Sequence, residues 1–220
     1  MTYIPIGKLV IDFDIYPRAE VDSQHVAYLA EALRAGNTLP ALIVEKKTYR
    51  IADGVHRYRA HMQVFGADHE VEAIEKTYAS DAELFLDAAR YNSGHGRILT
   101  MFDRTHCLLK ADQLKIEPDQ IASALQITIE KLGELRTGRV GNLRHGGDVP
   151  LKRTIQHMAG QRLTKPQMEA NRKLSGMNQM FYVNQLILLL ENDLLDVENE
   201  KLLDALARLR ALLTEQKMAA

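Results

Sequence analysis

The sequence predicts an α+β protein with a small mixed α/β domain at its N-terminus, an all-α domain that contains a helix-turn-helix, and a helical C-terminal region. Short apolar runs typical of strands alternate with helical patterns in the first part of the chain, and strand signals vanish from Asp81 onward. Glycines cluster between residues 138 and 147, which indicates a linker with turns. We therefore expect three regions, 1–80, 81–140 and 141–220.

The first region contains two helical segments, 23–36 and 56–66, each ending at a glycine. Asp22 or Ser23 can cap the first one, because a short polar side chain accepts hydrogen bonds from the free N–H groups at a helix start. The intervening runs carry the apolar and β-branched residues that suit a sheet. These runs are residues 4–12, 41–47, 49–53 and 71–78.

Helical periodicity dominates the remainder of the chain. Ser80 and Glu83 form a capping-box pattern at the start of the first of these helices. The leucines of the last helix form one stripe that must pack on another surface. The stretch 175–196 before it mixes Met, aromatic and leucine residues, which suits an oligomerisation or packing module, with a purely internal core as the alternative. We therefore predict a homodimer through the C-terminal helices. The expected helices are 80–92, 100–112, 119–125, 129–138, 150–160, 165–176, 178–192 and 199–216.

The composition is that of a soluble globular protein, with 46% hydrophobic and 26% charged residues. A single cysteine, Cys107, excludes an intramolecular disulfide. No apolar run approaches the roughly 20 residues of a membrane helix, so we expect a cytoplasmic protein without a membrane partner. The histidines show no metal-ligand spacing, and no structural zinc is predicted. The net charge of −1 conceals a basic segment, 134–173, which is suited to phosphate contacts.

Residues 118–138 can form a helix-turn-helix, because two short helical patterns with apolar residues on one side flank a three-residue turn. The second helix would then lie in the major groove of DNA, and the protein would be associated with the nucleoid. Glu130 and Glu134 on its exposed side would repel phosphates, so an ordinary pair of bundle helices is the alternative. The candidate DNA contacts are Thr128, Lys131, Arg136 and Arg139.

The stretch IADGVHRYRA, residues 51–60, places a glycine where a strand turns into a helix. The backbone N–H groups at a helix N-terminus form a natural anion site. His56, Arg57 and Arg59 add donors that suit a di- or triphosphate. The alternative is that Gly54 is only a turn residue and the arginines solvate a helix face.

Several boxes of the sequence resemble those of the ParB/sulfiredoxin superfamily, in particular ParB N-terminal domains. Tyr16–Arg18 (YPR) is similar to the family's Asn-Pro-Arg element in the first loop. The next helix of the family typically ends in a glycine before a strand that begins near a proline, and AEALRAGNTLPALIV resembles that pattern. Residues 54–60 align with the Gly-Glu-Arg-Arg-x-Arg-Ala box, and Tyr91-Asn92-Ser93 with the residues up to Arg97 resembles the Glu-Asn-x-Gln-Arg box. The resemblance covers roughly residues 4–140 and implies a helix-turn-helix after the α/β domain.

ParB proteins bind CTP through these boxes and organise plasmid or chromosome partition. The resemblance therefore implies that this chain binds CTP or another nucleoside triphosphate, with Mg²⁺ as a candidate metal, and that nucleotide binding gates engagement of DNA in partition or transcriptional regulation. The implied phosphate-site residues are Arg18, Gly54, His56, Arg57, Arg59, Asn92, His95 and Arg97, with Asn92 at the metal or phosphate.

Two departures from the family boxes bear on catalysis. Val55 and Tyr91 stand where ParB has glutamates, so carboxylates that could coordinate Mg²⁺ or orient a water are missing. Nucleotide binding is therefore expected rather than efficient hydrolysis. Sulfiredoxins need a cysteine at the position of Val55, and the only cysteine of this chain is Cys107.

Two other functions stay open at the level of sequence. Asp53-Gly54-x-His56-Arg57 resembles the Asp-Gly-His-His-Arg motif of free-serine kinases in the same superfamily. A small-molecule phosphotransferase of this type would use Glu20 as the base and Asp53 to hold Mg²⁺. The third possibility is an adaptor that has kept the fold and lost the nucleotide.

Overall fold

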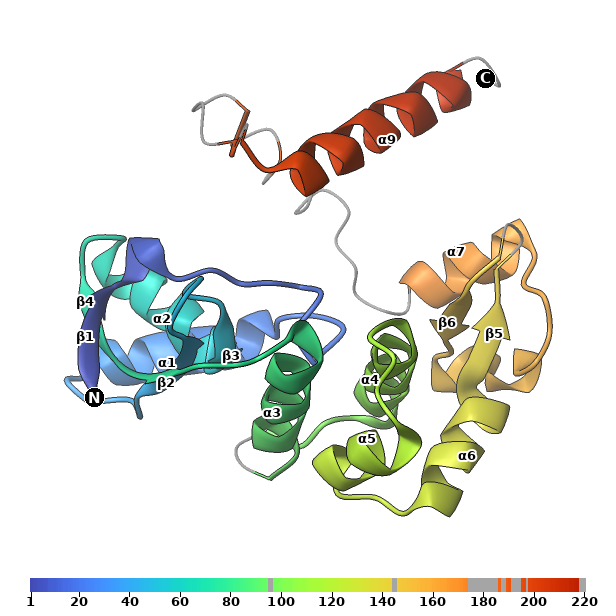
Figure 1. Ribbon diagram of the computed structural model, residues 1–220, viewed down its shortest axis with the longest axis horizontal. Coiled ribbons are helices and arrows are strands. Elements are labelled where there is room, and N and C mark those ends of the chain that lie inside the picture. Colours follow the sequence, from blue (N-terminus) through green and yellow to red (C-terminus); the bar gives the residue numbers. More distant parts are fainter. Residues whose placement is uncertain are drawn as a thin grey trace. The chain divides into compact units, whose positions relative to one another are not determined.

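The computed structural model describes residues 1–94, 97–143, 146–173, 186, 189–190, 195–196 and 198–217. The chain divides into two compact units, Met1–Gly176 and Met177–Ala220. The protein is α+β, as the sequence predicts. Figure 1 shows the order of the elements along the chain.

A four-stranded sheet forms the centre of the N-terminal region, in the order β1-β4-β2-β3 (Figure 1). β1 and β4 pair antiparallel, β2 and β4 pair parallel, and β2 and β3 form a hairpin. The strands are β1 (Thr2–Pro5), β2 (Leu42–Glu45), β3 (Ile51–Asp53) and β4 (Glu70–Lys76). The run 4–12, predicted as one strand, ends as a strand at Pro5 and continues as a 3₁₀ turn, η1 (Ile6–Lys8).

Helices α1 (Ser23–Arg34) and α2 (Val55–Phe65) pack against each other beside this sheet (Figure 1). Asp22 caps α1, accepting hydrogen bonds from the backbone N–H groups of Gln24 and His25 at 2.9 and 3.2 Å. Val26, Ala30 and Leu33 recur on the buried side of α1, because residues three and four apart share a helix face. The two helices thereby hold the chain segments that border the cavity described below.

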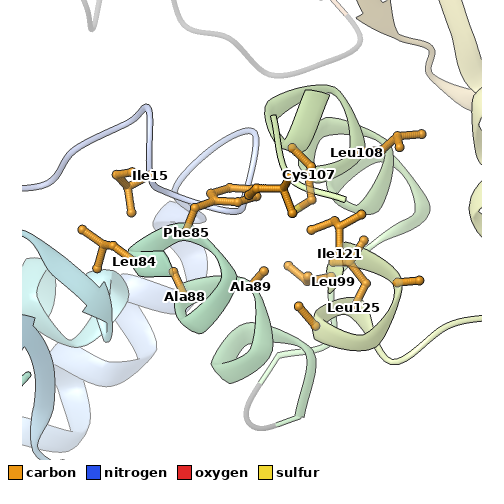
Figure 2. Close-up of a cluster of buried hydrophobic side chains, with 14 of the residues drawn as sticks. Ile15, Leu84, Phe85, Ala88, Ala89, Leu99, Cys107, Leu108, Ile121 and Leu125 are labelled. Atoms are coloured by element: carbon orange, nitrogen blue, oxygen red, sulfur yellow. The ribbon is translucent and has the colours of Figure 1, made fainter. Parts of the chain in front are cut away.

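Four further helices follow the sheet: α3 (Asp81–Gly94), α4 (Met101–Gln113), α5 (Pro118–Leu125) and α6 (Ile129–Arg139). Figure 2 shows how side chains from α3, α4 and α5 and from the loop around Ile15 meet in one apolar cluster. Phe85 of α3 is fully buried within it, and the Cys107 thiol is buried as well and donates to the Pro17 carbonyl at 3.0 Å. The loop between η1 and α1, residues 9–22, which we call the first loop, thus shares a common core with α3 and α4.

The region after α6 differs from the sequence prediction. A linker was expected over 138–147 and a helix over 150–160, but the chain forms a hairpin of β5 (Val140–Asn142) and β6 (Asp148–Pro150), then a 3₁₀ segment η2 (Arg153–Met158). The expectation that strands vanish after Asp81 is therefore wrong here. The chain packs closely at Gly141, since a Cβ there would lie 3.0 Å from Leu151 Cδ2.

Two more helices are described beyond the hairpin. α7 (Lys165–Lys173) covers the start of the predicted helix 165–176, whose last residues lie outside the described part of the chain. The predicted helix 178–192 also lies mostly outside it. In the second unit, α9 (Glu200–Lys217) agrees with the predicted helix 199–216.

Candidate anion-binding site

A cavity of about 420 Å³ opens where the first loop, α1, the N-terminus of α2 and the end of α3 meet. It contains most of the predicted phosphate-site residues, which come from segments far apart in the sequence. The predicted residues among its lining are Arg18, Asp53, Gly54, His56, Arg57, Asn92 and Arg97. Arg59 and Glu20 are not among the described residues that line it, and His95 lies outside the described residues.

Gly54 forms the turn between β3 and α2 in a conformation that favours glycine. Its φ is +103°, and it stands at the N-cap position of α2. A Cβ at this position would lie 2.4 Å from Leu42 Cδ2, so even alanine collides with the sheet. The N-terminus of α2 and its backbone dipole therefore face the cavity at a residue without a side chain, an arrangement that favours anions.

Arg18 ties the first loop to the end of α3. It is almost fully buried, its Nε donates to Asn92 Oδ1 at 3.1 Å, and its Nη2 donates to the Arg97 carbonyl. Asn92 in turn donates from Nδ2 to the Ala88 carbonyl at 2.9 Å. Because a buried guanidinium needs acceptors, these contacts set the position of the residues after α3 relative to the cavity.

Arg57 has a structural task that the sequence did not reveal. Its Nη1 donates to the Pro40 and Ala41 carbonyls at 2.8 and 2.7 Å, and its Nη2 pairs with Asp53 Oδ2 at 2.6 Å. The side chain therefore fastens the segment entering β2 and neutralises the Asp53 carboxylate. A phosphate at Arg57 would have to compete with these acceptors.

Asp22 contacts two residues of the cavity lining, His56 and Arg97. The Asp22 N–H donates to His56 Nε2 at 3.1 Å, so the imidazole proton is on Nδ1 and the ring is neutral. Burial lowers the pKa of His56 to about 4, and the nearby side chains of Arg18, His25 and Arg57 act in the same direction. The Asp22 carboxylate also pairs with Arg97.

Sequence reasoning treated Asp22 only as a helix cap and missed its contact with Arg97. The cap pattern gave no signal for that contact, because the two residues are 75 positions apart. Tyr16 was missed too. It lines the cavity and is almost fully buried, and its hydroxyl has no hydrogen-bond partner within the described residues. Burial raises the pKa of Tyr16 above its usual range.

Tyr91, which stands where the resembled box has a glutamate, has its hydroxyl engaged by a lysine. Lys76 Nζ donates to Tyr91 Oη at 2.6 Å and to Asp87 Oδ2 at 2.9 Å. The hydrogen bond to Tyr91 is the main cause that raises the pKa of Lys76. Tyr91 therefore lines the cavity while its polar atom pairs with the sheet.

The two helices predicted to form the DNA-binding element, α5 and α6, are joined by residues 126–128. Thr128 caps α6, accepting from the Lys131 N–H at 3.2 Å. Lys131 pairs with Glu134 at 2.6 Å, and Arg136 donates to both carboxylate oxygens of Asp112 at 2.6 and 2.8 Å. Two of the four predicted DNA contacts therefore have their charge balanced within the protein.

Comparison with known proteins finds partial similarity. No family model matches the chain. A possible regulatory protein of the streptomycin biosynthesis operon from Streptomyces griseus is 32% identical over 104 residues, 47% of this chain and 28% of that protein. The transcriptional regulator NovG from Streptomyces niveus is 31% identical over 101 residues, 46% of this chain and 30% of that protein. The matched part thus spans less than a third of either relative.

Among solved structures, C-terminally truncated ParB from Caulobacter crescentus is similar in two complexes. The complex with the centromeric parS site has a TM-score of 0.43 at 16% identity and covers 61% of this chain and 69% of ParB. The complex with CTP-γ-S has a TM-score of 0.38 at 18% identity and covers 60% and 73%.

Within the described residues, no helix is both long and apolar enough to span a bilayer. That part of the chain also holds no group of three or more His, Cys, Asp or Glu side chains placed to bind a metal ion.

Proposed function

We propose that this chain is a DNA-binding regulator whose N-terminal cavity binds a nucleoside triphosphate, with CTP as the first candidate. The observation that supports nucleotide binding is the convergence of Arg18, His56 and Arg97 on the N-terminus of α2. Cationic and neutral N–H donors at a helix start suit a phosphate chain, and the cavity volume is that of a small-molecule site. The two regulators with related sequences favour transcriptional regulation over partition.

The mechanism follows from the contacts of Arg97. Asp22 holds this guanidinium, and a phosphate that binds Arg97 replaces the Asp22 carboxylate. The Arg97 carbonyl accepts from Arg18, which also donates to Asn92 of α3. Replacement of Asp22 by a phosphate would therefore change the contacts at the end of α3. α3 shares an apolar core with α4 and α5, and a shift of α3 would therefore reach the predicted DNA-binding helices.

Mg²⁺ fits the residues predicted to hold it only poorly. Asn92 Oδ1 accepts from Arg18, and Asp53 Oδ2 accepts from Arg57, so each candidate ligand is engaged by an arginine. Mg²⁺ takes oxygen ligands in octahedral geometry, usually one or two carboxylates with substrate phosphates and water. We therefore expect the protein's own N–H donors to bind the phosphates.

A thermal-shift panel of nucleoside triphosphates, with and without Mg²⁺, tests this proposal. We expect CTP to raise the Tm most, and Arg97→Gln to weaken binding by about 10- to 100-fold, since a charge-assisted hydrogen bond contributes about 1.5–3 kcal/mol. Asp22→Asn retains a good helix cap but removes the competing charge, and should bind nucleotide more tightly. Lys47→Gln, an exposed charge outside the cavity lining, is the matched control.

The outcomes of this panel separate the three functions considered. A Tm shift that is unchanged in Arg97→Gln would contradict the assigned phosphate site. The absence of a Tm shift with every nucleotide would favour the adaptor that has lost nucleotide binding. The phosphotransferase predicts ADP formation that depends on a hydroxyl substrate and on Glu20, but Glu20 is not among the described cavity residues and Asp53 is paired with Arg57. No observation favours that reaction.

We further propose that the chain forms a homodimer through α9. Leu203, Leu209 and Leu213 are exposed on this helix within the single chain. Leucines at 202, 206, 209 and 213 follow the 4-3-4 spacing of a coiled-coil seam, which an identical helix can cover. Light scattering should give a dimer mass, and Leu209→Asp a monomer. A monomeric parent chain at micromolar concentration would contradict this part of the proposal.

A further inference from the structure

Arg139, the last residue of α6, and the segment after it form a small basic module, which we define as residues 139–165; Arg139 is counted with the module below. It has its own apolar core of Leu151, Ile155 and Leu163. The module is joined to α6 without an intervening loop, since α6 ends at Arg139 and β5 begins at Val140. Backbone hydrogen bonds close the join: the Leu151 N–H donates to the Arg139 carbonyl at 2.7 Å.

One helix supports both α6 and this module. α4 contacts α6 and also β6, so the two elements rest on a common platform (Figure 1). Lys152, which follows β6, places its Nζ 4.3 Å from the centre of the Phe102 ring of α4. The position of the module relative to α6 is therefore set by packing as well as by chain connection.

The charge of the basic module contrasts with that of the chain. Its sequence holds six lysines and arginines against one carboxylate, Asp148, whereas the whole chain has a net charge of −1. Arg153 and Lys165 are exposed, and Arg139 is half-buried. None of these three makes an ion pair with any residue in the described ranges. Their charges are therefore available to an external anion.

The exposed side of α6 ahead of Arg139 lacks this availability. Lys131 is paired with Glu134 and Arg136 with Asp112, and Glu130 adds a negative charge. Phosphate contacts provide much of the affinity of proteins for DNA, and each depends on a cation that is free to replace a counterion. α6 is thus a weak source of phosphate contacts, even if its side chains reach the bases.

We propose that the basic module, rather than α6, provides most of the contacts to the phosphate backbone of duplex DNA. The proposal rests on the DNA binding put forward above and says which surface carries it. Because the module is fixed to α6, its phosphate contacts would set the position of that helix on the duplex. In this arrangement, the module contacts phosphates and α6 contacts the bases.

The test compares the full chain with two triple variants of equal charge. Arg139→Gln/Arg153→Gln/Lys165→Gln removes three cations of the module, and Lys8→Gln/Arg34→Gln/Lys47→Gln removes three exposed cations of the N-terminal region. Affinity for a duplex DNA of mixed sequence is measured by fluorescence anisotropy over a salt series. Circular dichroism melts check that both variants are folded.

The predicted quantity is the slope of log DNA affinity against log salt concentration. Each lost phosphate contact lowers the slope of log affinity against log salt by about 0.9, so the module variant should lose about 2.7. Between 50 and 200 mM salt, the factor by which the affinity of the parent chain falls should therefore be about 40 times larger than the factor for the module variant. The N-terminal variant should keep the parent slope.

Three results would overturn the inference, and they are distinguishable from one another. If the parent chain binds DNA and the module variant keeps its slope, the phosphate contacts lie elsewhere, while the proposed function stands. If both triple variants lose the same slope, only net charge matters. If the parent chain binds no DNA at low salt but is retained on anionic phosphatidylserine vesicles, the module serves a membrane surface and the proposed DNA function fails with it.

Discussion

Replacing Gly54 by alanine perturbs both the backbone and the packing at the start of α2. Gly54 has a φ of +103°, and the Cβ of an alanine would lie 2.4 Å from Leu42 Cδ2 and 3.2 Å from Arg57 Cζ. Leu42 is 1% exposed, so it has little room to move away. Arg57 is held by three acceptors and cannot easily give way either.

The destabilisation follows from two costs and one gain. A left-handed backbone costs a non-glycine residue about 1–2 kcal/mol, and overpacking a core costs about 1–3 kcal/mol. Alanine also reduces the entropy of the unfolded chain, which stabilises by about 0.4–1 kcal/mol. We therefore expect Gly54→Ala to lower the free energy of unfolding by about 2–4 kcal/mol, a large share of the stability of an ordinary domain.

Urea denaturation followed by circular dichroism measures this change, and the chain offers a matched control. Gly133 lies inside α6, and a Cβ there would meet no atom within 4 Å. Gly133→Ala should raise the free energy of unfolding by about 1 kcal/mol, because alanine is the better helix former. A Gly54→Ala protein within about 0.5 kcal/mol of the parent chain would refute the reasoning on Gly54.

Three further predictions concern single side chains. Tyr16→Phe removes a buried hydroxyl without a partner in the described residues and should leave the urea-derived stability unchanged or raise it by about 1 kcal/mol; a clear loss would reveal a partner. Phe85→Ala empties a fully buried site and should cost about 3–5 kcal/mol, and a change below about 1 kcal/mol in a thermal melt would contradict the packing in Figure 2. His56 has a folded pKa of about 4, below its unfolded value of 6.5, so the unfolded state takes up the proton first as the pH falls; stability should be full above pH 6.5 and decline by about 3 kcal/mol towards pH 4. His56→Gln retains an acceptor for the Asp22 N–H and should flatten this part of the stability-against-pH curve, whereas an unaltered curve would assign the pH dependence to other groups.

Long helices and the turn at Gly54 were predictable because their signals are local. α1, α5 and α6 carry apolar residues at helical spacing, and their caps at Asp22 and Thr128 lie within a turn of the groups that they satisfy. Gly54 lies between a strand-like run and a helical one, so its place at the start of α2 also followed from neighbouring residues.

The hairpin β5–β6 could not be predicted in this way. Its strands have three residues each, too few to show an alternating pattern, and the glycines in and between them are as typical of a linker. Leu151 and Leu163 pack closely against the backbone of β5 at Gly141, and these leucines lie 10 and 22 positions further along the chain.

The candidate site shows the same division. The local pattern of a glycine, a histidine and two arginines at a strand-to-helix turn was enough to predict an anion site there. Which side chains of the candidate site are free was decided by partners distant in the chain: the Pro40 and Ala41 carbonyls accept from Arg57, and Asn92 accepts from Arg18. A hydrogen bond needs two atoms within about 3 Å, and only packing of the folded chain brings residues 16 to 75 positions apart to that distance.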